Sequence, residues 1–199
     1  MAVISTPHIT VGRAVRFLHN APLGGDAAFI EPLSDGLFLA IIDVLGHGAP
    51  ADRVRIDIER FFGENTDPDM ARVIIALDQF LQGTIGAAAG LCHIADISGE
   101  VCYVGVGNTV ARRFGETDTR LVSRDGVLGQ ISPRPRIEKL RMADGDTLVL
   151  YTDGVRSHFE IDDYPRLLSD DPQLVADTIL GSFGKAHDDA ACLVAKFRQ

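Results

Sequence analysis

Four acidic motifs in this chain contain residue types that could bind a divalent cation. They are Gly25-Asp26, Asp43-Val44-Leu45-Gly46-His47-Gly48, Asp153-Gly154 and His187-Asp188-Asp189. Each motif lies at an expected turn beside an apolar run of the sequence. Carboxylates at the ends of buried strands can converge across a sheet, and their oxygens are ligands that hard cations such as Mg²⁺ prefer. The motifs therefore predict metal-dependent chemistry at one end of a sheet.

Each motif taken alone also fits an ordinary turn, because Asp-x-x-Gly and Asp-Gly sequences are common where strands end. His47 lies between two glycines and could act as an acid, contact a phosphate or support a metal ligand. A structural or exposed histidine fits the sequence equally well. Asp188 and Asp189 repel each other unless a cation or hydrogen-bond donors compensate. The joint occurrence of the motifs at strand ends favours a shared site.

The length and composition suit one globular domain over residues 1–199. The chain has 199 residues, and its 46% apolar residues can fill a sizeable core. Nineteen basic and 28 acidic residues give a formal net charge of −9. This balance argues against nucleic acid as a partner, because a phosphate backbone requires a basic surface. It leaves an acidic substrate open, since a bound cation can reverse the local field.

Cysteine usage and hydropathy predict a cytoplasmic protein with no membrane partner. Cys92, Cys102 and Cys192 are far apart and lie in apolar runs, which is typical of buried thiols in a reducing compartment. The N-terminus has no basic start followed by an apolar stretch, so no signal peptide is expected. No apolar run reaches the roughly 18 residues of a membrane span.

The apolar patterning predicts strands first, then two helices, further strands, a helix and a closing strand. Helical spacing or a proline start predicts helices at about 51–62, 69–82 and 172–182. Strands are expected at 8–18, 27–31, 36–44, 84–97, 100–106, 110–114, 137–142, 147–152 and 190–197. The run at 36–44 is apolar throughout, which indicates burial on both faces. This order defines an α+β fold with antiparallel sheets and helices outside them.

In this order, the motifs resemble those of the type 2C (PPM) metal-dependent protein serine/threonine phosphatases, and most closely the bacterial SpoIIE/RsbX branch. The likeness spans about residues 8–197. The residues that carry it are 25–26, 42–48, 83–88, 103–108, 126–129, 150–155 and 188–190.

The resemblance implies a four-layer α-β-β-α sandwich with two mainly antiparallel sheets and a metal centre at one edge. It also implies two divalent cations, Mn²⁺ or Mg²⁺. By resemblance, Asp43 would bridge both cations, and Asp153 and Asp188 would hold one of them. Asp26 and the backbone carbonyl of Val44 would help to hold the other. His47 is the candidate catalytic general acid.

The implied activity is hydrolysis of phosphoserine or phosphothreonine on a regulatory protein, expected to be a STAS-domain or stress-signalling component. The alternative is a non-catalytic module of the same fold that docks a STAS or anti-sigma partner. A third reading, an HD-type phosphohydrolase, rests on His187-Asp188, but that fold places its ligands on several helices.

The chain also departs from the family pattern. Val44 follows Asp43, at a position where the family usually has glycine, and a backbone ligand tolerates this change. The phosphate-binding arginine of the eukaryotic members has no clear match, and Arg13 and Arg16 are the nearby candidates. Few insertions are present, which suits a compact stand-alone phosphatase.

Overall fold

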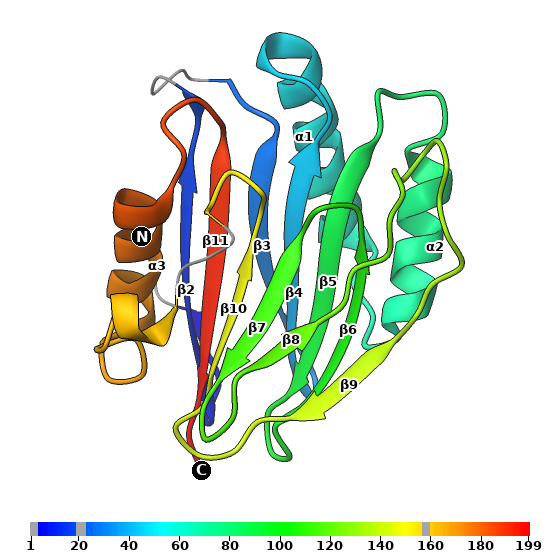
Figure 1. Ribbon diagram of the computed structural model, residues 1–199. Coiled ribbons are helices and arrows are strands. Elements are labelled where there is room, and N and C mark those ends of the chain that lie inside the picture. Colours follow the sequence, from blue (N-terminus) through cyan, green and yellow to red (C-terminus); the bar gives the residue numbers. More distant parts are fainter. Residues whose placement is uncertain (1–3, 19–22, 157–159) are drawn as a thin grey trace.

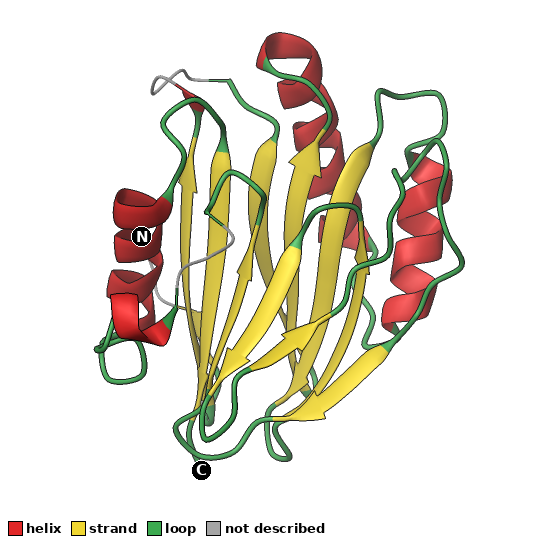
Figure 2. Ribbon diagram, in the orientation of Figure 1, coloured by secondary structure: helices red, strands yellow, loops and turns green. Residues whose placement is uncertain are grey.

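The structure is a computed structural model that describes residues 4–18, 23–156 and 160–199 (Figure 1). Two antiparallel sheets are stacked face to face, and helices cover their outer faces (Figure 2). The six-stranded sheet has the order β1 (Ile4–Ser5), β2 (Ile9–Arg16), β11 (Ala190–Phe197), β10 (Thr147–Tyr151), β7 (Val110–Phe114) and β8 (Thr119–Leu121). The five-stranded sheet has the order β3 (Asp26–Leu33), β4 (Gly36–Val44), β5 (Ala87–Ala95), β6 (Glu100–Val106) and β9 (Glu138–Arg141).

The helices form the two outer layers. Helix α3 (Pro172–Phe183) packs on β2 and β11 of the six-stranded sheet, while α1 (Gly48–Glu64) and α2 (Met70–Phe80) cover the five-stranded sheet (Figure 1). A short 3₁₀ helix lies at Ile161–Asp163. The layers confirm the expected α-β-β-α sandwich. None of the described helices is long and apolar enough to cross a membrane.

Strand β4 contributes side chains to the cores on both faces of its sheet. Leu39 and Ile41 lie in the core between the two sheets, whereas Ala40 and Ile42 belong to the core under α1 and α2. This alternation follows from the period of two along a strand. It confirms that the apolar run at 36–44 is buried on both faces.

The structure moves some expected boundaries by a few residues. Helix α1 begins at Gly48, three residues before the helical spacing predicts, because a proline such as Pro50 is tolerated in a first turn. Strand β5 begins at Ala87, since Gly83 and Gly86 both adopt a positive φ that ends regular structure. The short strands β1 and β8 are additions, because runs of two or three residues leave no periodic signal.

The outer edge of β2 is covered by a side chain from α3. The Gln173 amide donates to the backbone carbonyl of Arg13 at 2.8 Å, and its oxygen accepts from the backbone N–H of Arg13 at 3.2 Å. Gln173 thus forms the pair of hydrogen bonds that a neighbouring strand would form with this residue. The interaction joins the start of α3 to the sheet.

Candidate metal centre

Asp26 and Asp43 are directly paired across β3 and β4. Directly opposite residues of an antiparallel pair project from the same face of the sheet. Asp43 continues the alternation of Leu39 and Ile41, and Asp26 continues that of Ala28, so this is the face between the sheets. Both carboxylates therefore stand at the end of the central core, where the next inward-facing positions along the strands are apolar.

The opposite sheet contributes Asp153 and Asp188 at the same end. Asp153 comes two residues after β10, and Asp188 lies in the turn that precedes β11. The side-chain amide of Asn108, just beyond β6, donates to Asp153 Oδ2 at 2.7 Å and to Asp43 Oδ2 at 3.1 Å. Carboxylates from both sheets are thus linked through one amide nitrogen. Their common location follows from the antiparallel order, which brings these strand ends to one edge.

The carboxylates interact electrostatically. Burial, followed by repulsion from Asp43, raises the pKa of Asp26 well above its usual range, although a hydrogen bond from Thr152 opposes the change. Burial and repulsion from Asp153 raise the pKa of Asp43 to about 6. Burial and the same neighbour also raise the pKa of Asp188. A cluster of acids that disfavour their own ionised forms is one in which a cation would be stabilising.

Thr152 fixes the side chain of Asp26. The Thr152 hydroxyl donates to Asp26 Oδ2 at 2.6 Å and accepts from the backbone N–H of Ala191 at 3.0 Å. Both Asp26 and Thr152 are buried, at 4% and 0% exposure. The threonine therefore connects the first strand of one sheet to β11 of the other at the candidate centre.

Asp189 holds the backbone on the N-terminal side of Asp26. Its two carboxylate oxygens accept from the backbone N–H groups of Leu18 at 2.7 Å and Gly25 at 2.8 Å. These hydrogen bonds stabilise the negative charge of Asp189, which offsets its repulsion from the adjacent Asp188. Asp189 thus has a structural task, which leaves Asp188 as the member of the pair available to a cation.

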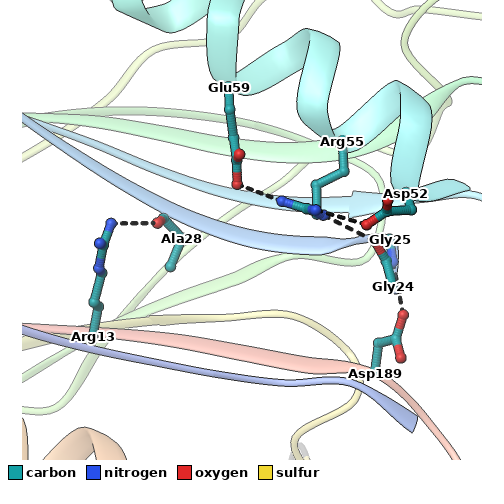
Figure 3. Close-up of polar contacts among 8 residues, drawn as sticks. All are labelled: Arg13, Gly24, Gly25, Ala28, Asp52, Arg55, Glu59 and Asp189. Atoms are coloured by element: carbon teal, nitrogen blue, oxygen red, sulfur yellow. Dashed lines mark hydrogen bonds and ion pairs between the residues drawn. The ribbon is translucent and has the colours of Figure 1, made fainter. Parts of the chain in front are cut away.

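Arg55 of α1 holds the same loop from the opposite side (Figure 3). Its Nε donates to the carbonyl of Gly24 at 3.0 Å, and its terminal nitrogens pair with Asp52 at 2.6 Å and Glu59 at 2.7 Å. Glycine is required at position 25 for close packing of the loop on β4. A Cβ on Gly25 would lie 2.8 Å from the carbonyl oxygen of Val44. The loop is therefore fixed between helix α1 and Asp189.

Val44 is the last residue of β4, and His47 lies on the turn that follows the strand. Val44 is buried in the core under α1, and its backbone N–H donates to the carbonyl of Gly25 at 3.2 Å. His47 is exposed and occupies the residue before α1, with an extended backbone and no side-chain bond to the helix terminus. His47 is close in sequence to Asp43, and its ring is accessible to solvent.

The two candidate arginines have different surroundings. The guanidinium of Arg16 donates to the carbonyl of Lys185. The guanidinium of Arg13 donates to the carbonyl of Ala28 at 3.4 Å (Figure 3). Arg13 also lines a cavity of about 340 Å³ together with Asp26. Of the two, Arg13 shares a cavity with a candidate metal ligand.

The donor set fits a hard divalent cation. Carboxylate oxygens and a backbone carbonyl are the ligands that Mg²⁺ and Mn²⁺ take, and no thiol adjoins the cluster within the described residues. Within that part of the chain, no three acidic, histidine or cysteine side chains are arranged as a ready-made metal site. Asn108 occupies one oxygen each of Asp43 and Asp153. The residue types and their shared edge fit the ion, which would have to replace the amide as their partner.

Three residues of the sequence motifs support the predicted metal ligands, and the sequence alone does not predict these contacts. Asn108, Thr152 and Asp189 adjoin predicted ligands in the structure, but none has a side chain whose type alone indicates this position. The glycine before Asn108 and the turn after β6 are the only local signals. The HD-type reading is not supported, because His187 and Asp188 lie in a turn and not on a helix.

The same fold occurs in several solved phosphatase structures. RsbX in complex with magnesium has a TM-score of 0.85 at 18% identity, and the match covers 98% of each chain. A chain from a structure described as "The bacterial stressosome: a modular system that has been adapted to control secondary messenger signaling" has a TM-score of 0.86 at 24% identity, covering 94% of this chain and 99% of that one. The PP2C phosphatase domain of SpoIIE from Bacillus subtilis has a TM-score of 0.80 at 18% identity, covering 96% of this chain and 63% of that one.

These likenesses show that the chain has the fold of the PP2C-type phosphatases, a family that generally uses divalent metal ions. The family model described as "Stage II sporulation protein E (SpoIIE)" matches residues 34–198. The chain belongs to this family. The matched range begins after Asp26, so the family match does not include that residue. No curated protein matches the chain at the level of sequence.

Proposed function

We propose that the protein is a metal-dependent phosphatase that hydrolyses phosphoserine or phosphothreonine on a regulatory protein. The observation that carries the proposal is the convergence of four carboxylates at one edge of the sandwich. Asp26 and Asp43 come from one sheet, and Asp153 and Asp188 from strand ends of the other. Membership of the SpoIIE family supports the phosphatase class.

The proposed ligands are those that the resemblance implies, and the placement of these carboxylates supports them. Asp43 lies between the two sheets' contributions and would contact both Mn²⁺ or Mg²⁺ ions, while Asp153 and Asp188 would hold one. Asp26 and the Val44 carbonyl would help to hold the other. When bound, two such cations bind a phosphate between them and lower the pKa of a water molecule that can attack it.

The chain's own residues would orient the reaction. Thr152 and Asp189 keep Asp26 and its loop in place, so the charge at this edge is fixed before a substrate arrives. His47 is exposed beside the turn, where it could give a proton to the departing serine oxygen. Arg13 shares a cavity with Asp26 and supplies positive charge there.

The proposed substrate is a phosphorylated STAS-domain or other stress-signalling protein. Support comes from the fold shared with RsbX and with a stressosome chain, each covered almost completely. The second candidate function is a non-catalytic module that docks the same kind of partner. The exposed surface of the helices that leave the Asp43 turn would serve either function. A metal titration separates the two, because a docking module would have no requirement for Mn²⁺.

The first experiment is Mn²⁺-dependent hydrolysis of a generic phosphate ester. Asp43→Asn and Asp153→Asn should each lower the rate by several orders of magnitude, because removing a ligand charge weakens the cation and raises the pKa of its water. Asp57→Asn, on α1, is the matched control, because its side chain is 47% exposed and pairs only with Arg60 among the described ion pairs; it should retain the wild-type rate. Folded Asp43 and Asp153 variants with near wild-type rates would overturn the two-metal assignment.

A further inference from the structure

Basic residues gather on one part of this acidic chain. Residues 112–141 contain eight arginines or lysines and four acids, which gives this segment a net charge of +4. The whole chain carries −9, so the remaining residues carry −13. The segment includes β7, β8 and β9 and the connection between β8 and β9, which runs past α2 (Figure 1). Arg112 and Arg113 are largely buried in ion pairs with Asp118, Glu160 and Asp146, so they add little to the accessible charge. The exposed positive charge of the segment includes Arg124 and Arg134, which would attract an acidic partner.

Arg124 brings positive charge next to the candidate centre. Its backbone carbonyl accepts from Gly107 at 2.8 Å, and its N–H donates to Gly105 at 2.9 Å. Gly107 directly precedes Asn108, whose amide contacts Asp43. The Arg124 guanidinium donates to the carbonyl of Arg134 at 3.3 Å, and both residues are exposed. Among the described residues, neither of the two guanidinium groups forms an ion pair.

Ile131 is an exposed aliphatic residue on an ordered turn near these arginines. Its side chain is 83% exposed, although its backbone pairs with Val127. The turn between them is anchored to α2, because the N–H of Gly129 donates to Asp78 Oδ1 at 2.7 Å. A single exposed aliphatic side chain is common on protein surfaces, but such residues mark interaction surfaces when they occur together with other apolar surface.

A small cavity adjoins the same turn. It measures about 210 Å³ and lies between α2 and residues 132–135, with Ile74, Val106 and Pro133 among its lining residues. Ile75 on α2 is 46% exposed at its rim. Arg134 and Asp78 also line the cavity, and Asp78 already accepts the Gly129 N–H. The surface therefore offers positive charge outside ion pairs, an exposed aliphatic side chain and a mainly apolar recess that Arg134 adjoins.

We propose that the surface formed by Arg124, Ile131 and Arg134 docks an acidic segment of the partner protein that also carries an apolar side chain. The inference rests on the proposed function in one respect, since it takes the docked segment to lie next to the phosphorylated residue. Charge complementarity selects an acidic segment, and the neighbouring recess takes its apolar residue. Docking here places the segment beside Asn108 and the candidate metal ligands.

The test is a binding measurement that does not depend on turnover. A fluorescein-labelled acidic peptide containing one leucine is titrated with the full-length chain, and fluorescence anisotropy is recorded. Arg124→Glu/Arg134→Glu should weaken binding about tenfold and reduce its dependence on salt. The control is Lys139→Glu/Arg141→Glu, which changes net charge equally. Its residues pair with Cys102 and Glu100, at the far end of β6 from the centre.

A second pair of variants tests the apolar contact. Ile131→Ser should weaken binding of the leucine peptide, and it should affect a peptide that has serine in place of leucine less. Ile97→Ser is the matched control, because Ile97 is 81% exposed but lies in the turn between β5 and β6 at the far end. Circular dichroism of each variant checks that the fold is retained.

Several outcomes would overturn the proposal. They are wild-type binding by the Arg124/Arg134 variant, an equal loss in the Lys139/Arg141 control, and binding of a neutral peptide as tightly as the acidic one. Equal binding of an oligothymidine of matched charge would favour nucleic acid instead and also overturn it. A chain that binds the acidic peptide but hydrolyses no phosphate ester would contradict the proposed function and leave this surface supported.

Discussion

At the scale of single residues, Asp43 is a proposed metal ligand whose ionised side chain lowers the stability of the folded state when no metal is bound. Its folded pKa of about 6 lies above the ordinary value of 3.8, because burial and Asp153 disfavour the charged form. A raised carboxyl pKa means that the stabilising contribution is present below pH 3.8 and is lost as the pH rises through about 6. At neutral pH without metal, ionised Asp43 therefore destabilises the folded state.

The first residue-scale prediction follows from this sign. In EDTA at pH 7.5, Asp43→Asn should raise the free energy of unfolding by about 2 kcal/mol, and at pH 4 it should change little. Urea unfolding at the two pH values measures both. With Mn²⁺ present, the wild type should be more stable than Asp43→Asn, because the variant lacks one of the proposed metal ligands. Asp57→Asn is the control, and destabilisation by Asp43→Asn at pH 7.5 in EDTA would contradict the argument.

His47 can be tested by the choice of leaving group. If it protonates the departing oxygen, His47→Ala should lower the rate on alkyl phosphates by about 10²–10⁴-fold. The loss on aryl phosphates should be smaller, because their leaving groups need less protonation. Hydrolysis rates of both ester types, measured for the wild type and the variant, show whether His47 acts as the general acid. Equal losses would instead indicate a structural or metal-orienting role.

The residue scale also shows how far the sequence predicts the site. The positions of Asp26, Asp43, Asp153 and Asp188 at strand ends could be predicted, because each follows or precedes an apolar run. The task of Asn108 could not, since its two contacts come from β4 and β10, which are remote in sequence. The same holds for Asp189, whose partners at Leu18 and Gly25 depend on tertiary structure.

At the scale of elements, close packing of α3 on the six-stranded sheet depends on one glycine. A Cβ at Gly12 of β2 would collide with the backbone of Pro172 and Gln173, at the start of α3. Gly12→Ala should therefore lower the free energy of unfolding by about 1–3 kcal/mol, as overpacked positions do. Thermal or urea unfolding measures the change.

Gly63 in α1 provides the control, because it is a glycine that no neighbouring element contacts closely. No atom lies within 4 Å of a Cβ added there, and the residue is in α1. Gly63→Ala should leave stability unchanged or raise it by up to about 1 kcal/mol, because alanine favours a helix. Equal destabilisation by the two substitutions would indicate that packing of α3 on Gly12 is not responsible.

The sequence predicts elements where a long periodic run exists and misses them where tertiary contacts decide. Strand β4 could be identified because nine residues of nearly continuous apolar character admit few alternatives. Strand β8 has only three residues and exists because β7 offers its edge for pairing. The end of α2 at Phe80 likewise depends on the turn at Gly83, whose positive φ the spacing of apolar residues does not report.

At the scale of the whole molecule, the proposed partner would have to be recognised by the surface, because a compact fold with few insertions offers no deep specificity pocket. An intact phosphorylated STAS-domain protein should therefore have a higher kcat/KM than a phosphopeptide cut from the same site, because remote contacts are lost on truncation. Phosphate release from both substrates measures the difference. Comparable values would mean that the surface does not select the partner, and the phosphatase assignment would stand.

The hydrogen bonds between Gln173 and Arg13 have a consequence for behaviour at high concentration. An open strand edge is a template on which a second molecule can add its own strand and begin an aggregate. At Arg13 both backbone groups are already satisfied by a side chain of the same molecule. Loss of this amide, as in Gln173→Ala, would expose the template, so colloidal stability of the protein depends in part on a single glutamine.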